Sequence, residues 1–596
     1  MEWIGMEWID RVGSFPSLVV VPIRIRVRTE RWNERPGTTT TTGTMAMTRA
    51  SSTSTSIGGW TTRERATGRG RRVLTRRGHR GRCASLRKNS GPTRTRAGTR
   101  AGRTSVMMVT RRVGVRTRSS VGSRDGDGDG YGEEEALVSA SGAPLPPLLR
   151  MSTPRAVWYV GWPTTLIGLM RSLFPLTDTF WVGKLGITEL NALCSNSFAG
   201  WMLYLLCSIV AYGVQNRVSV KVGAEKFSEV GAVLRDGLYG ALVTYGCLAA
   251  LVPFTAAYTS TLGIACDGTF AIGQSHLKAS LLGAVGLCFS NILEATLRGF
   301  GSMKPALWVT LLMVVCNIVL DPLFMFGIGP FPKLGVAGAA VGTSISNCIG
   351  ALLYYRMLVK DFEVKIPITL PNMKALKDII GIGAPIAVAG IVFAMVYVGL
   401  GRILTGLDEY ALTAMGIGQQ FENIPYTVTE AFRIGTSTLV GQWMGARNAK
   451  RARGAGWNAI AIASVALIPF GVFFIAFAPY LVSFLTTNTV VASKAVEYMY
   501  WNFPIVSFMA LECAVEGAFT GTGVTYPVLV IAILLNFSRL PIAAALAPTY
   551  GVAGVWFTIV FTQVVKSCLK AVWLEKVFKD LIRDDEKMSS EDVAAA

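Results

Sequence analysis

Long apolar runs alternate with short polar loops from residue 156 to residue 574. Runs of roughly 18 or more apolar residues are long enough to cross a bilayer as helices. These runs lack the period-two alternation of membrane barrel strands, so each is predicted to be a helix. The predicted spans are 156–182, 190–214, 234–258, 270–294, 305–328, 335–358, 379–403, 410–440, 456–484, 497–520, 525–546 and 551–574. The pattern therefore predicts an all-α membrane protein with twelve transmembrane helices.

The loops between these spans differ in positive charge. The loops after even-numbered spans and the span ends beside them hold fifteen lysines and arginines, between Arg217 and Arg453, whereas those after odd-numbered spans hold four. Such an excess marks the cytoplasmic side of a membrane protein. Both ends of the helical region are therefore predicted to lie on one cytosol-like side.

The helical region contains an internal repeat. The segment "ILEATLRGFGSMKP" at 292–305 recurs as "AVEGAFTGTGVTYP" at 514–527, an offset of 222 residues. Later pairs are offset by slightly less: "NIVLDP" at 317–322 matches "NFSRLP" at 536–541, and "GVAG" at 335–338 matches 551–554. Two repeats with a site between them are typical of transporters. We predict six-helix lobes at 151–365 and 366–575, followed by a polar tail at 576–596.

The segment before the first span has a different composition. Between residues 40 and 120 the only acid is Glu64, among many arginines, serines and threonines. An Arg-rich, Ser-rich and acid-poor stretch is typical of an organelle transit peptide. Residues 1–150 are therefore predicted to be a disordered extension that includes a plastid transit peptide and ends in an acidic, Gly-rich linker. The expected partner is the plastid import machinery; a retained basic tail is the alternative, and nucleic-acid binding is not expected.

Composition narrows the function classes. The chain is 51% hydrophobic and 16% charged, below the charged content of typical soluble proteins. Its two histidines and scattered cysteines form no metal or nucleophile motif, so neither an enzyme nor a cofactor is predicted.

Two predicted spans in the first half contain a carboxylate. Asp178 lies three residues after Pro175, and Asp321 lies directly before a proline. Ionisable groups inside a membrane are costly and are functional candidates by default. Asn317 shares a helix face with Asp321, and Thr343 adds a hydroxyl from the next span. These oxygens suit a proton or Na⁺, with Pro175 as a hinge; a buried structural bond is the alternative.

Polar side chains also occur in the second half. Gln419, Glu422, Asn423, Glu430 and Glu512 lie within predicted spans. A substrate-binding or second-ion role and a structural role are both open for the acids. In the first half, Glu294 stands four residues before Arg298, a spacing that predicts a structural ion pair.

Several motifs resemble those of the multidrug and toxic compound extrusion (MATE) family. They are "PLTDTFWVGKLG" at 175–186, "LRGFGSMKP" at 297–305, "NIVLDPLFMFG" at 317–327, "GVAGAAVGTSIS" at 335–346 and "STLVGQWMGA" at 437–446. The resemblance covers about residues 156–575 and implies two six-helix bundles in a V shape. It implies cation-coupled efflux of small organic compounds by alternating access, with Asp178, Asn317, Asp321 and Thr343 as the cation site.

The resemblance also implies a branch and a location. The chain is similar to plastid-type members, including chloroplast-located proteins of plants, so a chloroplast envelope membrane and a monomer are expected. The seventh predicted span, 379–403, has no acid, unlike another bacterial branch.

Two other transport functions remain open. A lipid-linked sugar or lipid flippase is expected to line its cavity with cations, for which Arg402 and Arg433 are the clear candidates. A channel fits less well, because an asymmetric site in a two-lobe repeat favours exchange over a continuous pore.

Overall fold

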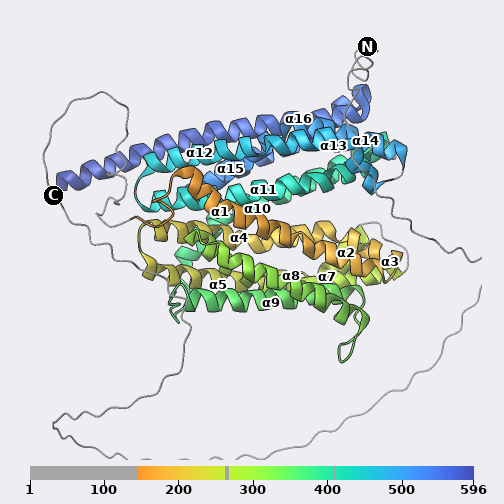
Figure 1. The fold of residues 1–596 in the computed structure, drawn as a ribbon, viewed down its shortest axis with the longest axis horizontal. Coiled ribbons are helices and arrows are strands. Elements are labelled where there is room, and N and C mark those ends of the chain that lie inside the picture. The colour runs from red at the N-terminus through yellow and green to blue at the C-terminus, as the bar shows by residue number, and fades with distance from the viewer. Residues whose placement is uncertain (1–144, 262–267, 409, 487, 596) are drawn as a thin grey trace, which may run out of the picture. The chain divides into compact units, whose positions relative to one another are not determined.

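The computed structural model describes residues 145–261, 268–408, 410–486 and 488–595, which belong to one compact unit, Gly122–Ala596. These residues form helices joined by short turns (Figure 1). The predicted extension, apart from its last residues, lies outside the described part of the chain. The helices of the first half are α1 (Thr153–Arg171), α2 (Leu173–Gly183), α3 (Ile187–Ser195), α4 (Ser197–Gly223), α5 (Phe227–Ala249), α6 (Thr255–Thr261), α7 (Gly268–Phe300), α8 (Lys304–Phe326) and α9 (Val336–Lys360).

The second half repeats this plan with longer helices. They are α10 (Met373–Leu407), α11 (Ala411–Gly445), α12 (Ala449–Ala466), α13 (Ile468–Leu485), α14 (Thr489–Asn502), α15 (Val506–Thr522) and α16 (Tyr526–Ala595). In Figure 1 most first-half helices gather on one side of the unit, and most second-half helices on the other. The predicted polar tail continues α16 as helix to Ala595.

Helix α16 is two helices that meet at a break. Gly551 has φ 59° and ψ −140°, a conformation that glycine adopts readily. Arg539 contacts Thr562 across the break, and Asn536 contacts Lys566, so the two parts run antiparallel. Gly335, the repeat partner of Gly551, precedes α9 with nearly the same backbone angles, φ 59° and ψ −136°. The repeat seen in the sequence is therefore also present in the backbone conformation.

Within the described residues, nine helices are long and apolar enough to cross a membrane. Ten of the twelve predicted ranges fall on these nine, because 525–546 and 551–574 both lie on α16. The other two ranges meet the test less well: 156–182 is divided between α1 and α2, and 410–440 falls on the polar α11.

The break between α1 and α2 follows from the sequence. Pro175 has no N–H group, so it cannot bond the carbonyl of Arg171 one turn earlier. The first helix ends at Arg171, and α2 begins at Leu173. A kink is thus present close to the residue that was predicted to act as a hinge.

The two halves meet along a seam of glycines in α4, α10 and α11. Gly213 lies against the backbone of Ile379, and Gly223 lies against that of Gln442. A methyl group at either glycine would collide with a carbonyl oxygen of the other half. Asn216 adds hydrogen bonds of 2.7 and 2.8 Å to backbone carbonyls of α15. The glycines therefore allow backbone-to-backbone contact between the halves.

A short segment before α1 belongs to the packed core. Leu145, Leu148 and Leu149 are buried in the main hydrophobic cluster, although the extension was predicted to reach residue 150. The backbone N–H of Leu149 donates to the carbonyl of Pro146, which turns the segment toward α1.

Candidate functional site

The four predicted cation-site residues converge from three helices, in a group called here the ion pocket. Asp178 comes from α2, Asn317 and Asp321 from α8, and Thr343 from α9. The Asn317 amide donates to Asp321 Oδ1 at 2.8 Å and to Thr343 Oγ1 at 3.0 Å. Asp178 lies within interaction distance of both Asp321 and Asn317. The structure therefore assembles the whole predicted set, with Asn317 at its centre.

A glycine makes room for this arrangement. A Cβ atom at Gly342 on α9 would collide with Asp321 Oδ1 and would stand 3.1 Å from the Asp321 backbone nitrogen. The close approach of α9 to α8 therefore depends on a residue without a side chain. It buries both Asn317 and Asp321 completely.

Several acceptor atoms in the ion pocket have no donor. Asp178 Oδ1, Asn317 Oδ1 and Asp321 Oδ2 are buried and receive no hydrogen bond from the described residues. Buried oxygens without a donor are costly, so this set favours the binding of a proton or a cation. Carboxylate, amide and hydroxyl oxygens are the ligands that hard cations prefer. The described residues contain no group of three or more His, Cys, Asp or Glu side chains suited to a metal ion.

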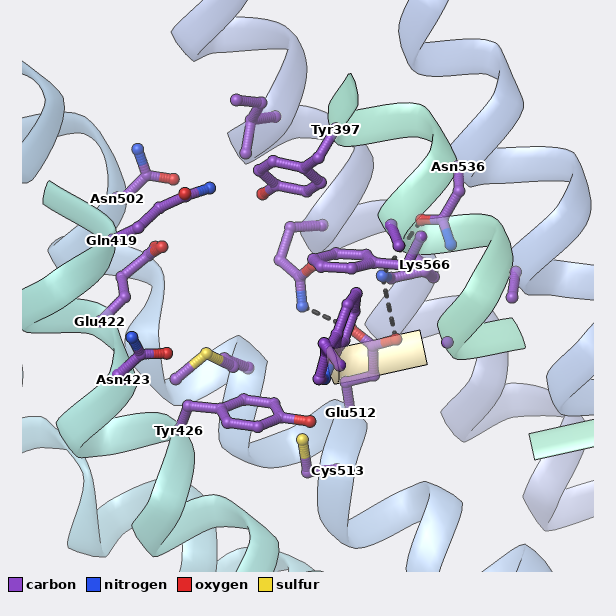
Figure 2. Close-up of a pocket in the computed structure, with 18 of the residues that line it drawn as sticks. Tyr397, Gln419, Glu422, Asn423, Tyr426, Asn502, Glu512, Cys513, Asn536 and Lys566 are labelled. Carbon is purple, nitrogen blue, oxygen red and sulfur yellow. Dashed lines mark hydrogen bonds and ion pairs between the residues drawn. The ribbon is translucent and has the colours of Figure 1, made fainter. Parts of the chain in front are cut away.

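The second half contains a large cavity of about 1170 Å³. All five predicted substrate residues line it: Gln419, Glu422, Asn423, Glu430 and Glu512. Its wall also includes aromatic side chains, namely Trp201 and Tyr212 from α4, Phe393 and Tyr397 from α10, Tyr426 from α11 and Phe503. Figure 2 shows Gln419, Glu422 and Asn423 on one side of this space, and Glu512, Asn536 and Lys566 on the other.

The cavity also contains cations that sequence reasoning missed. Lys566 and Lys570 from α16 line it and are almost fully buried. Arg539 lies directly behind its aromatic wall, 5.6 Å from the ring centre of Phe393. Arg402 and Arg433, the two predicted cationic candidates, also line the cavity, so the prediction was correct for both but missed the two lysines. The signal was present, because buried lysines within a predicted span are functional candidates as much as acids are.

Most charges in the cavity are paired. Lys570 contacts Glu512 and Glu516 at 2.5 Å each. Arg433 donates to both carboxylate oxygens of Glu430, at 3.0 Å to Oε1 and 2.6 Å to Oε2. These contacts give Glu430 and Glu512 a structural component, whichever ligand the cavity holds.

An equivalent ion pair holds the first half together. Glu294 is fully buried and binds Arg298 at 2.5 Å, as predicted. It also binds Arg171, at the end of α1, which the sequence did not indicate. The kink before α2 is thus anchored to α7 by a buried charge pair.

Comparison with known proteins matches the same family model to both halves of the chain. A model of the MatE family matches residues 163–323 and 385–545, and the two matched segments begin 222 residues apart, the offset of the internal repeat. The probable multidrug resistance protein NorM of Thermotoga maritima is 24% identical over 417 residues, covering 68% of this chain and 88% of the relative. An FAD transporter of Shewanella oneidensis is 28% identical over 315 residues, covering 51% of this chain and 66% of the relative.

Solved structures share the fold. An outward-facing multidrug resistance MATE family transporter superposes with a TM-score of 0.68 at 22% identity, covering 73% of this chain and 98% of the other. A MOP superfamily transporter from Pyrococcus furiosus, described as having reversed polarity in its binding pocket, gives a TM-score of 0.67 at 22% identity and the same coverage. The matched segments cover more than half of this chain, which therefore belongs to the MatE family and is an integral, multi-pass membrane transporter rather than an enzyme.

Proposed function

We propose that this antiporter binds H⁺ or Na⁺ in the ion pocket and exports a small organic compound from the second-half cavity. The observation that carries the proposal is the set of three buried oxygens without donors, on Asp178, Asn317 and Asp321. Relatives whose names state multidrug resistance, FAD transport or multidrug export support the export of organic compounds.

Ion binding has a direct route to the helix kink. Asp178 lies on α2, one turn after Pro175, while α1 is held to α7 through Arg171 and Glu294. Neutralising the two carboxylates removes their mutual repulsion and lets α2 change its angle relative to the anchored α1. Exchange follows when the ion and the substrate each favour a different state of the two halves.

A flippase for lipid-linked sugars or lipids is the second candidate. It is favoured by the buried lysines Lys566 and Lys570 and by Arg433, since such a protein needs cations for an anionic headgroup. Against it, each of these cations has a carboxylate contact in this structure.

The membrane arrangement is also a proposal. Twelve spans in two six-helix lobes that together form a V, at 151–365 and 366–575, are consistent with the halves described above. A monomer in the chloroplast envelope, imported through the N-terminal extension, is proposed from the composition of residues 1–150 and from the resemblance to plastid-type members.

Counterflow in proteoliposomes tests the coupling. Under an imposed pH or Na⁺ gradient, the wild type is expected to accumulate a fluorescent organic ion, and Asp321→Asn is expected to lose gradient-driven uptake, by about tenfold or more. Asp361→Asn, at the exposed end of α9, is the matched control and is expected to keep it. The gradient that drives uptake identifies the ion, whereas undiminished uptake by Asp321→Asn would overturn the proposal.

A further inference from the structure

The wall of the cavity formed by α16 has an excess positive charge. Lys566 Nζ lies 3.1 Å from Glu512 Oε1 and 3.4 Å from Asn536 Oδ1. The same Glu512 oxygen is held more closely, at 2.5 Å, by Lys570. Lys570 also holds Glu516. Lys566 therefore shares a carboxylate that already has a stronger partner.

Arg539 adds a third cation to this wall. It is 1% exposed, and its described hydrogen bonds go to the neutral side chains of Thr562 and Gln563. Its Nη1 atom has no partner among the described residues. Three buried cations thus face the buried carboxylate of Glu512 and the half-buried carboxylate of Glu516, and the surplus lies at Lys566 and Arg539.

The opposite wall, on α11, has an acid that no cation in the described part of the chain contacts directly, although Arg539 acts on it electrostatically. Glu422 accepts a hydrogen bond of 2.9 Å from the Tyr498 hydroxyl and belongs to none of the ion pairs found among the described residues. Its neighbours on the cavity wall are the neutral amides Gln419 and Asn423. Glu430, about two helical turns further along α11, differs because Arg433 pairs with it.

Aromatic side chains occupy the space between these two walls. The ring of Phe393 lies 5.5 Å from Lys566 Nζ, and Tyr397 stands next to it, with a ring separation of 4.6 Å. Figure 2 shows Tyr397 between the Gln419–Glu422 side and the Lys566 side. Aromatic walls with few, well-placed polar groups are typical of sites for flat organic ligands.

We propose that the cavity recognises a zwitterionic aromatic compound, whose acidic group binds Lys566 near Arg539 and whose cationic group binds Glu422. A purely cationic ligand leaves the surplus positive charge at Lys566 and Arg539 uncompensated. A purely anionic ligand leaves the negative charge of Glu422 without a direct partner. Buried charges without partners oppose binding, so the two walls together select for opposite charges on one molecule. This inference names the substrate class of the antiporter proposed above and rests on that proposal only for transport.

Three dyes with one xanthene core test the charge preference. Rhodamine B carries a cationic ring system and a free carboxylate, its ethyl ester is a cation only, and fluorescein is an anion only. Fluorescence anisotropy with the purified full chain is expected to show rhodamine B binding about tenfold more tightly than either of the others. Equal affinities, or tightest binding of the ester, would overturn the inference.

Charge-removing variants assign the two ends of the ligand. Lys566→Met is expected to reduce rhodamine B affinity to that of the ester, whereas Glu422→Gln is expected to reduce it to that of fluorescein. Lys566→Arg keeps the charge and is expected to keep the preference, which separates recognition from folding. Lys494→Met and Glu575→Gln are matched controls, because both residues pair away from the cavity. An unchanged preference in folded Lys566→Met would overturn the assignment.

The binding assay uses no ion gradient, so it fails independently of the coupling experiment. Tightest binding of rhodamine B without gradient-driven transport would contradict the proposed ion coupling and support the proposed recognition of a zwitterion. Gradient-driven transport of the ester in preference to rhodamine B would support the ion coupling and contradict the recognition of a zwitterion.

Discussion

The two halves share a backbone plan but differ in chemistry at equivalent positions. Asp178 of the first half corresponds to Leu400 of the second, and Asp321 corresponds to Leu540. Leu400 is fully buried in a small apolar cluster, against which Leu540 packs. Thr343 corresponds to Ile559 in the same cluster. The place that holds the ion pocket in one half is therefore a hydrophobic core in the other.

Around the cavity the second half has the charged residues and the first half has neutral ones at the equivalent positions. In the first half, Ser290 contacts Asn347 at 3.4 Å, and in the second half Glu512 and Gln563 occupy the matching positions and contact each other at 2.5 Å. Gly350 corresponds to Lys566. The shared backbone plan therefore does not require charge at either place, and the charged positions are those of the proposed ion and substrate sites.

The largest expected effect compares the equivalent glutamates Glu294 and Glu516. Glu294→Gln leaves Arg171 and Arg298 buried without a carboxylate and is expected to cost about 3–5 kcal/mol of stability. Glu516→Gln is expected to cost less, because Lys570 keeps its contact with Glu512. Thermal unfolding in detergent measures both, and equal losses would contradict the contrast drawn here.

A carboxylate placed in the apolar counterpart of the ion pocket sharpens the comparison. Leu400→Asp is expected to lower stability by about 3 kcal/mol, because a carboxylate in the membrane interior is costly without partners. Asp178→Leu is the converse change, and it is expected to abolish coupled transport without lowering the unfolding temperature. The comparison breaks if Leu400→Asp is as stable as the wild type.

The smallest effect is expected at the glycine that separates α8 from α9. Gly342→Ala pushes a methyl group against Asp321, and such overpacking typically costs about 1–3 kcal/mol. We expect it to weaken the coupling ion's apparent affinity in transport assays, with folding preserved. Gly381→Ala, where a Cβ atom meets nothing within 4 Å, is the control. An unchanged ion dependence in Gly342→Ala would show that the spacing at Asp321 does not matter.

The sequence was sufficient for the features that have a strong local cause. Acids within apolar runs pointed to Asp178 and Asp321, and the i, i+4 spacing added Asn317, which contacts Asp321 as expected. The pairing of Arg171 with Glu294 could not be predicted, since it joins helices 123 residues apart. Lys566 and Lys570 on the cavity wall were missed for another reason. Whether their charges are compensated depends on which helices face the same cavity, and the sequence does not show this.

Helix breaks were only partly readable. Prolines explain several helix breaks, such as the division at Ser172. The number of spans also depends on whether two neighbouring apolar runs form one helix or a hairpin. At Gly551 the helix is interrupted by non-helical backbone angles, and the contacts of Arg539 and Lys566 show that the chain direction reverses there.

The buried leucines ahead of α1 set a limit on how the chain can be shortened. Leu145, Leu148 and Leu149 belong to the same hydrophobic cluster as the transmembrane helices. Proteolytic maturation that ended before residue 145 would leave this cluster whole, whereas cleavage after residue 149 would remove three buried side chains and open a void beside Gly301, which Leu148 touches. Any proteolytic shortening of this chain is therefore limited by its core, independently of the sequence that a protease recognises.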